Sequence, residues 1–283
     1  MTRALPDLLI EPVVRMALAE DLGRTGDVTA QACIPEDARF KAVFTARQAG
    51  VMAGGAVVRL TIHALDASAT VTPRVADGEA FEAGTVLIEA EANARALLSA
   101  ERTALNLLAR MCGIATLTRT YVEAVAGTAA RIADTRKTMP GLRALDKHAV
   151  ACGGGLNHRF GLDDAILIKD NHVAVCGSAG EAVRRARAFA PHLMKVEVEV
   201  DTLEQLDEVL AEAPDVIMLD NFSLDDLKEA VRRARAAGSA VLEASGGVNL
   251  STVVDIAATG VDVISVGALT HSVSQLDIGL DAG

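Results

Sequence analysis

Residues 195–221 read KVEVEVDTLEQLDEVLAEAPDVIMLDN, and this stretch decides the fold class. It opens with a β-branched run at 195–198, continues through a helix-forming segment and returns to an apolar run at 216–219. A strand, a helix and a second strand at this spacing indicate a βα unit whose strands lie parallel in one sheet.

The same alternation extends in both directions along the chain. Comparable runs occur at 131–134, 165–168, 240–243 and 263–266, so that strand starts recur every 20 to 35 residues. Six such units are more than a small open sheet usually has and fewer than the eight of a complete barrel. The sequence therefore predicts an incomplete parallel α/β barrel.

The chain before about Met111 has a different pattern. Residues 6–21 are predicted to form a helix, and the segments 41–46, 69–75 and 86–90 are predicted to form strands. A long helix is predicted from about Ala94, with Arg102 and Asn106 on one face. This mixture predicts a separate N-terminal α/β domain.

Composition excludes several classes of protein. The 283 residues are 51% hydrophobic and carry a formal net charge of −11. An acidic chain is a poor partner for nucleic acid or an anionic membrane surface. No apolar run reaches the 18 residues that a membrane-spanning helix needs, and the first 20 residues lack the apolar core of a signal peptide. The four cysteines form no CxxC pair, which favours reduced thiols in a cytoplasmic protein.

Polar or glycine-rich residues follow each of the six runs. They are Thr135-Arg136-Lys137, Lys169 to His172, Glu199 with Asp201, Asp220-Asn221, Ser245-Gly246-Gly247 and Gly267-Ala268. A single Asp or Ser at such a place is commonly a helix cap. Six in succession predict a ligand site, because the carboxyl ends of barrel strands form one rim where active sites lie.

The chemistry of this rim divides in two. Between residues 131 and 172, seven Lys or Arg residues stand against five acidic residues, although the whole chain is acidic. Paired hydrogen bonds from Arg suit carboxylates, so this half predicts a small anionic substrate. The later half offers Glu199 and Asp220 for ribose hydroxyls or Mg²⁺, and then glycine-rich turns for phosphate.

Glu197 lies two residues before Glu199 and should point to the same side of its strand. If that side faces the barrel interior, Glu197 is expected to lie deeper and to support Lys169 or another cation. Taken alone, the residues predict an enzyme that joins a carboxylate-bearing anion to a phosphorylated sugar.

Several longer segments resemble the quinolinate phosphoribosyltransferase family. The resemblance spans about residues 20–271, and the only departure noted within it is Met139, where Thr is usual. The matching segments are 134–143 (DTRKTMPGLR), 153–159 (GGGLNHR), 166–172 (ILIKDNH), 196–199 (VEVE), 218–222 (MLDNF), 243–247 (EASGG), 264–271 (ISVGALTH), 26–29 (GDVT) and 98–106 (LSAERTALN).

The resemblance implies a seven-stranded incomplete α/β barrel with an N-terminal α/β sandwich domain. The expected domains are residues 1–111, joined by the C-terminal tail 272–283, and residues 112–271, which carry the active site. It also implies a homodimer or higher assembly in which the N-terminal domain of one subunit covers the barrel of another.

The resemblance also implies roles for residues of the rim. The two carboxylates of quinolinate would be bound by Arg136, Arg159, Lys169 and His158, with Thr135 beside them. Arg102 would reach the same site from the partner subunit. Lys137 would help to bind the pyrophosphate. Glu199 and Asp220 would bind the ribose hydroxyls, and they would hold Mg²⁺ indirectly, through phosphoribosyl pyrophosphate. The 5-phosphate would bind at Ser245, Gly246, Gly247, Val266, Gly267 and Ala268, with His271 near it.

The implied reaction transfers phosphoribosyl from phosphoribosyl pyrophosphate to quinolinate with decarboxylation. It yields nicotinate mononucleotide, pyrophosphate and CO₂ on the de novo route to NAD. Catalysis would rest on Lys137, Lys169, Glu199 and Asp220, with no side chain acting as nucleophile.

Three alternatives stay open at the level of the sequence. One is a relative of the same fold, of the ModD type or using another pyridine or azole acid. A second is a Schiff-base aldolase barrel in which Lys169 is the nucleophile. A third is a binding protein for phosphorylated metabolites without catalytic activity.

Overall fold

The computed structural model describes residues 4–283, and the first three residues of the predicted domain 1–111 lie outside this range. The chain forms two compact units. The first contains Met1–Arg119, Thr138–Gly154 and Leu269–Gly283, and the second contains Thr120–Lys137 and Gly155–Ala268. The segment Thr138–Gly154, placed in the barrel domain by the expected limits, belongs to the first unit by its contacts.

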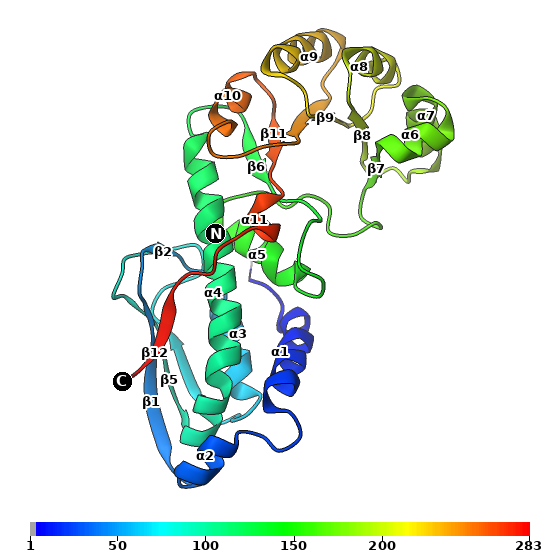
Figure 1. Ribbon diagram of the computed structural model, residues 1–283. Helices are drawn as coiled ribbons and strands as arrows, with labels where there is room; N and C mark the ends of the chain where they lie inside the picture. The colour runs from blue at the N-terminus through cyan, green and yellow to red at the C-terminus, as the bar shows by residue number, and fades with distance from the viewer. Residues whose placement is uncertain (1–3) are drawn as a thin grey trace. The chain divides into compact units, whose positions relative to one another are not determined.

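An antiparallel sheet organises the first unit (Figure 1). Its strand order is β12-β1-β5-β3, so the last strand of the chain pairs with the first. The strands are β1 (Arg39–Ala46), β3 (Thr70–Pro73), β5 (Val86–Asn93) and β12 (Ile278–Ala282), and β2 (Gly50–Val51) pairs separately with β4 (Ala80–Phe81).

The first unit also contains helices, two of which contribute buried residues to an aliphatic core that they share with this sheet. The predicted helix 6–21 is α1 (Asp7–Leu22), and the long predicted helix is α4 (Ala94–Ala124). The others are α2 (Val28–Cys33), α3 (Gly55–His63) and α5 (Arg143–Gly153). Phe44, Leu87, Leu97 and Leu108 are fully buried in the core between sheet and helices, which confirms a helix-on-sheet N-terminal domain.

The second unit is built on a parallel sheet of six strands. Each of the six runs predicted from the sequence forms one strand, in the order β6-β11-β10-β9-β8-β7. They are β6 (Arg131–Ala133), β7 (Ile166–Ile168), β8 (Val196–Val200), β9 (Val216–Asp220), β10 (Val241–Ser245) and β11 (Val263–Ser265). The predicted parallel α/β architecture is confirmed.

The expected seventh strand is replaced by a single bridge. Leu156 pairs in parallel with Ala133 on the outer edge of β6, and no further pairing continues it. The short GGGLNH segment gives one bridging residue instead of a strand, because its glycines favour turns. Within the described residues β6 and β7 do not pair with each other, so the sheet stays open.

Helices follow the strands and lie along one face of the curved sheet (Figure 1). Three of them begin at a capping hydroxyl that accepts a hydrogen bond from a backbone N–H of the first turn: Ser178, Thr202 and Ser223. The helices are α6 (Asp170–Cys176), α7 (Ala179–Phe189), α8 (Leu203–Leu210), α9 (Leu224–Ala237) and α10 (Val253–Ala258). The last helix, α11 (Ala268–His271), follows β11 and belongs almost wholly to the first unit. None of the helices in the described chain is long and apolar enough to cross a membrane.

Candidate active site

The carboxyl ends of the parallel strands surround a hollow of about 350 Å³. Polar side chains from all six strand ends or the loops after them line it, as the alternation of strands and polar turns predicts. The lining residues are Thr135, Arg136, Lys137, His158, Arg159, Leu167, Lys169, Glu199, Met218, Asp220, Glu243, Ser245 and Ser265.

One side of the hollow carries two arginines with unsatisfied donors. The Nε groups of Arg136 and Arg159 are buried and have no hydrogen-bond partner among the described residues. Burial, and then the positive charge of Arg136, lower the pKa of Arg159 below its usual value. Arg159 is held by a bond from Nη1 to the carbonyl oxygen of Ala165, at 3.1 Å. Two adjacent guanidinium groups with free donors are arranged to receive an anion.

Carboxylates also line the hollow. Glu199 forms an ion pair with the Lys169 ammonium, and Asp220 Oδ2 accepts a 2.6 Å hydrogen bond from Asn221 Nδ2. Oxygens of Glu199, Asp201 and Asp220 lie within 4.8 Å of one another. Oxygen donors grouped in this way fit Mg²⁺, which prefers carboxylate and water ligands.

A buried cluster supports the floor of the hollow. His158 Nδ1 accepts a 2.8 Å hydrogen bond from the backbone N–H of Arg159, so the ring proton lies on Nε2. Nε2 is 3.0 Å from Glu197 and 3.8 Å from Glu243. Burial and the charge of Glu197 raise the pKa of Glu243 to about 7, although His158 acts in the opposite direction. The side chains of Glu197 and Glu199 are almost equally buried, at 8% and 9% exposed, and the group beside Glu197 is His158 and not Lys169.

The glycine-rich turn after β10 has the backbone conformation that its sequence implies. Gly246 and Gly247 have φ values of 90° and 60°, a backbone conformation in which residues other than glycine are strained. A Cβ on Gly246 would also overlap Asn221. Val266 donates its backbone N–H to Ala133 at 2.9 Å, which ties the start of the second glycine turn to β6.

The structure brings nine of the predicted site residues to the hollow. These are Thr135, Arg136, Lys137, His158, Arg159, Lys169, Glu199, Asp220 and Ser245. Gly246, Gly247, Val266, Gly267 and Ala268 belong to the turns that follow β10 and β11 and do not line it.

The remaining two predicted residues belong to the first unit. Arg102 lies on α4 with a side chain that is 64% exposed, 4.0 Å from Glu101. His271 ends α11, where Nδ1 lies 2.6 Å from the hydroxyl of Ser272. Their assignment to the site stays a prediction.

Four residues of the hollow were missed at the level of the sequence: the apolar Leu167 and Met218, and the polar Glu243 and Ser265. Glu243 lies two positions before Ser245, as Glu197 does before Glu199, and alternate residues of a strand point to one side. The same rule, applied to β10, would have found Glu243. Ser265 ends β11, and its buried hydroxyl carries no comparable signal in the sequence.

Comparison with known proteins agrees with this geometry. Residues 27–112 match the N-terminal domain model of quinolinate phosphoribosyl transferase, and residues 114–281 match the C-terminal domain model. The chain is 51% identical to the nicotinate-nucleotide pyrophosphorylase [carboxylating] of Mycobacterium leprae over 271 residues, 95% of each chain. It is 43% identical to the probable enzyme of that name from Bacillus subtilis, over 97% of this chain and 93% of that one.

Solved structures give the same result. The nicotinate-nucleotide pyrophosphorylase of Francisella tularensis superposes with a TM-score of 0.93 at 39% identity, covering 100% of this chain and 98% of the other. Two matched domains and relatives of this identity along nearly the whole chain show that it belongs to the quinolinate phosphoribosyltransferase family.

Proposed function

We propose that this chain transfers the phosphoribosyl group of phosphoribosyl pyrophosphate to quinolinate. The products are nicotinate mononucleotide, pyrophosphate and CO₂, in the de novo synthesis of NAD. Family membership and relatives named nicotinate-nucleotide pyrophosphorylase support this activity.

One observation in the site carries the assignment. The buried Nε groups of Arg136 and Arg159 have no acceptor among residues 4–283, and both arginines line the hollow. Leaving a buried charged donor unpaired is costly, so a site of this kind is completed by a bound anion. The two adjacent carboxylates of quinolinate supply acceptors for both guanidinium groups.

The reaction requires two changes of bonding. The ring nitrogen of quinolinate forms a bond to the anomeric carbon of the ribose as the bond from that carbon to pyrophosphate breaks. Lys137, which lines the hollow, would bind the departing anion. The carboxylate next to the pyridinium nitrogen then leaves as CO₂, because the positive nitrogen stabilises the carbanion, which takes a proton.

Positioning supplies much of the catalysis in this scheme. Arg136 and Arg159 fix the acceptor, while Glu199 and Asp220 hold the ribose hydroxyls. Glu199 and Asp220 would also hold Mg²⁺ through phosphoribosyl pyrophosphate, and bound Mg²⁺ offsets negative charge on the leaving group.

We infer that the functional form is a homodimer or higher assembly in which Arg102 enters the hollow of a neighbouring subunit. The exposed position of Arg102 on α4 supports a role outside its own unit. We also place the enzyme in the cytoplasm, because its four cysteines are free and free thiols are typical of reducing compartments.

The Schiff-base alternative is not favoured by the surroundings of Lys169. A nucleophilic lysine needs an apolar pocket or a neighbouring cation to lose its proton. Lys169 instead pairs with Glu199, and its side chain is 46% exposed. Borohydride treatment with a sugar phosphate should therefore leave no covalent label on Lys169.

Competition between acceptors tests the assignment of the substrate. Nicotinate has the same ring as quinolinate but only one carboxylate, so it cannot satisfy both Arg136 and Arg159. With phosphoribosyl pyrophosphate and Mg²⁺ supplied, kcat/KM for quinolinate should exceed that for nicotinate by at least about a hundredfold. This ratio corresponds to a difference of roughly 3 kcal/mol in transition-state stabilisation. Equal use of both acids would show that the two arginines do not select the acceptor.

A further inference from the structure

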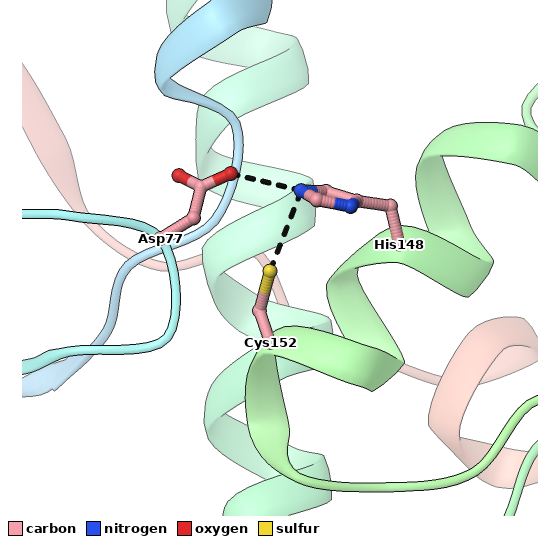
Figure 2. Close-up of side chains that lie close together, drawn as sticks. All are labelled: Asp77, His148 and Cys152. Atoms are coloured by element: carbon pink, nitrogen blue, oxygen red, sulfur yellow. Dashed lines mark hydrogen bonds and ion pairs between the residues drawn. The ribbon is translucent and has the colours of Figure 1, made fainter. Parts of the chain in front are cut away.

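Three potential metal ligands of different chemistry meet in the first unit (Figure 2). His148 Nε2 lies 2.8 Å from Asp77 Oδ2 and 3.5 Å from Cys152 Sγ. All three ligand atoms lie within 4.8 Å of one another, and none of these residues has a part in the proposed reaction. The carboxylate and the thiol approach the same ring nitrogen from different sides.

The fold holds each ligand in place. His148 and Cys152 are four residues apart on α5, a spacing that puts both side chains on one face of a helix. Asp77 lies in the loop between β3 and β4. Its other oxygen, Oδ1, accepts hydrogen bonds from the backbone N–H groups of Gly54 and Gly55, at 3.0 and 3.2 Å. Backbone support of this kind fixes the orientation of a ligand before a metal binds.

The surroundings set the charge of the ligands. Burial acts to raise the pKa of Asp77, but the hydrogen bonds from His148 and the two glycines outweigh it and the pKa is lowered, so the carboxylate stays ionised. Burial, followed by the charge of Asp77, raises the pKa of the Cys152 thiol, which therefore keeps its proton until a cation binds. Cys152 is only 2% exposed, whereas the side chain of Asp77 is 26% exposed and gives a route of entry.

We propose that Asp77, His148 and Cys152 form a binding site for a single Zn²⁺ ion. Oxygen, imidazole nitrogen and thiolate sulfur are its usual protein ligands, and three of them leave one position for water. The mixed set excludes Mg²⁺ and Ca²⁺, which take oxygen ligands. Zn²⁺ would join α5 to the Asp77 loop and the start of α3, and so stabilise the first unit.

Binding requires a defined change of protonation. Zn²⁺ replaces the proton of the Cys152 thiol, which is released to solvent. It also replaces the proton that His148 Nε2 donates to Asp77, which moves to Nδ1. Affinity should therefore rise with pH, because the protonated thiol competes with the metal.

A buried hydrogen-bond network without metal is the competing explanation. In that case the 2.8 Å bond between His148 and Asp77 already satisfies the carboxylate, and Cys152 fills space as a small apolar residue. The two explanations differ in whether the thiol ever ionises in the presence of a divalent cation.

Cobalt substitution in the full-length protein distinguishes them, because Co²⁺ bound to a thiolate gives a charge-transfer band that oxygen-only sites lack. We expect one equivalent of Co²⁺ to produce this band in the wild type and one equivalent of Zn²⁺ to abolish it. Cys152→Ser and His148→Gln should lower the affinity for Zn²⁺ by at least about a hundredfold, more than the loss of a group that only supports a ligand. Cys176→Ser, which changes a more accessible free cysteine, is the control and should keep the band.

Absence of the band in the wild type would overturn the proposal, even if both variants failed to fold. A band that persists in Cys152→Ser but disappears in Cys176→Ser would also overturn it. Neither outcome would affect the proposed transferase activity, since the readout is the spectrum and not turnover.

Discussion

The side chains of Arg136 and Arg159 determine which ligands the site can bind. Both have a buried Nε without a partner in the part of the chain that the structure describes, and burial lowers the pKa of Arg159. The sequence identified Arg136 from its place after the first strand run, and Arg159 from the local excess of cationic residues and from the resemblance to the family. It could not show that their donors are unsatisfied, since this depends on which acceptors the folded chain fails to supply.

Replacing Arg159 by alanine tests this point. We expect kcat/KM to fall by at least about a hundredfold, because an ionised group that binds the substrate is lost in a low-dielectric site. Arg185→Ala, on the exposed face of α7 and paired with Glu181, should retain full activity. Steady-state kinetics with quinolinate as the varied substrate measures both variants, and equal rates for the two would remove Arg159 from the site.

The raised pKa of Glu243 predicts that the stability of the fold depends on pH. Its pKa rises from 4.5 to about 7 on folding, chiefly through burial. Because the pKa of Glu243 is raised on folding, its contribution to stability is fully present at pH values below its pKa in the unfolded chain. This contribution is lost as pH rises through the pKa of the folded protein, by about 1.4 kcal/mol for each pH unit between the two pKa values.

Glu243→Gln removes this titration while keeping the shape of the side chain. The free energy of unfolding of the wild type, minus that of the variant, should decrease as pH rises from 4.5 to 7. Urea unfolding at several pH values measures it. A difference that stays constant over this range would show that the pKa of Glu243 is the same in the folded and the unfolded chain.

The structural elements followed from the sequence more closely than the connections between them. All six parallel strands were predicted, because each is a short β-branched run followed by a turn. The segment at Leu156 gives only one bridging residue, because the glycines that precede it favour turns. The pairing of β12 with β1 joins residues at opposite ends of the chain, and no local pattern predicts its register.

Close packing of α5 on α4 gives a prediction at the scale of elements. A Cβ on Gly153 would lie 2.5 Å from the carbonyl oxygen of Ala115 and from Cβ of Thr118. Gly153→Ala should therefore lower the free energy of unfolding by about 1–3 kcal/mol, the usual cost of overpacking.

Gly238→Ala is the matched control for this change. Gly238 follows α9 in an extended conformation, and a Cβ there would have no atom of the described residues within 4 Å. Thermal or urea unfolding of both variants measures the difference. Equal stability would mean that the two helices are not in such close contact.

At the scale of the whole molecule, the proposed site requires more than one subunit. Arg102 and Lys169 belong to different compact units, and we propose that they meet across a subunit interface. Arg102→Ala and Lys169→Ala homomers should each be inactive. Mixing them under conditions of subunit exchange should restore activity, because some mixed dimers contain one intact site.

A mixture that stays inactive after exchange has been verified would contradict the shared site. The sequence alone suggested this arrangement only through resemblance to a family. Neither composition nor spacing indicates where a second subunit binds, since that depends on surfaces formed after folding.

The most direct test of the proposed activity is turnover by the purified chain. Quinolinate, phosphoribosyl pyrophosphate and Mg²⁺ are supplied together and then with each omitted in turn, while nicotinate mononucleotide and CO₂ are measured. We predict equal amounts of both products only when all three are present. A folded protein that binds phosphoribosyl pyrophosphate but forms neither product from quinolinate would contradict the proposed function.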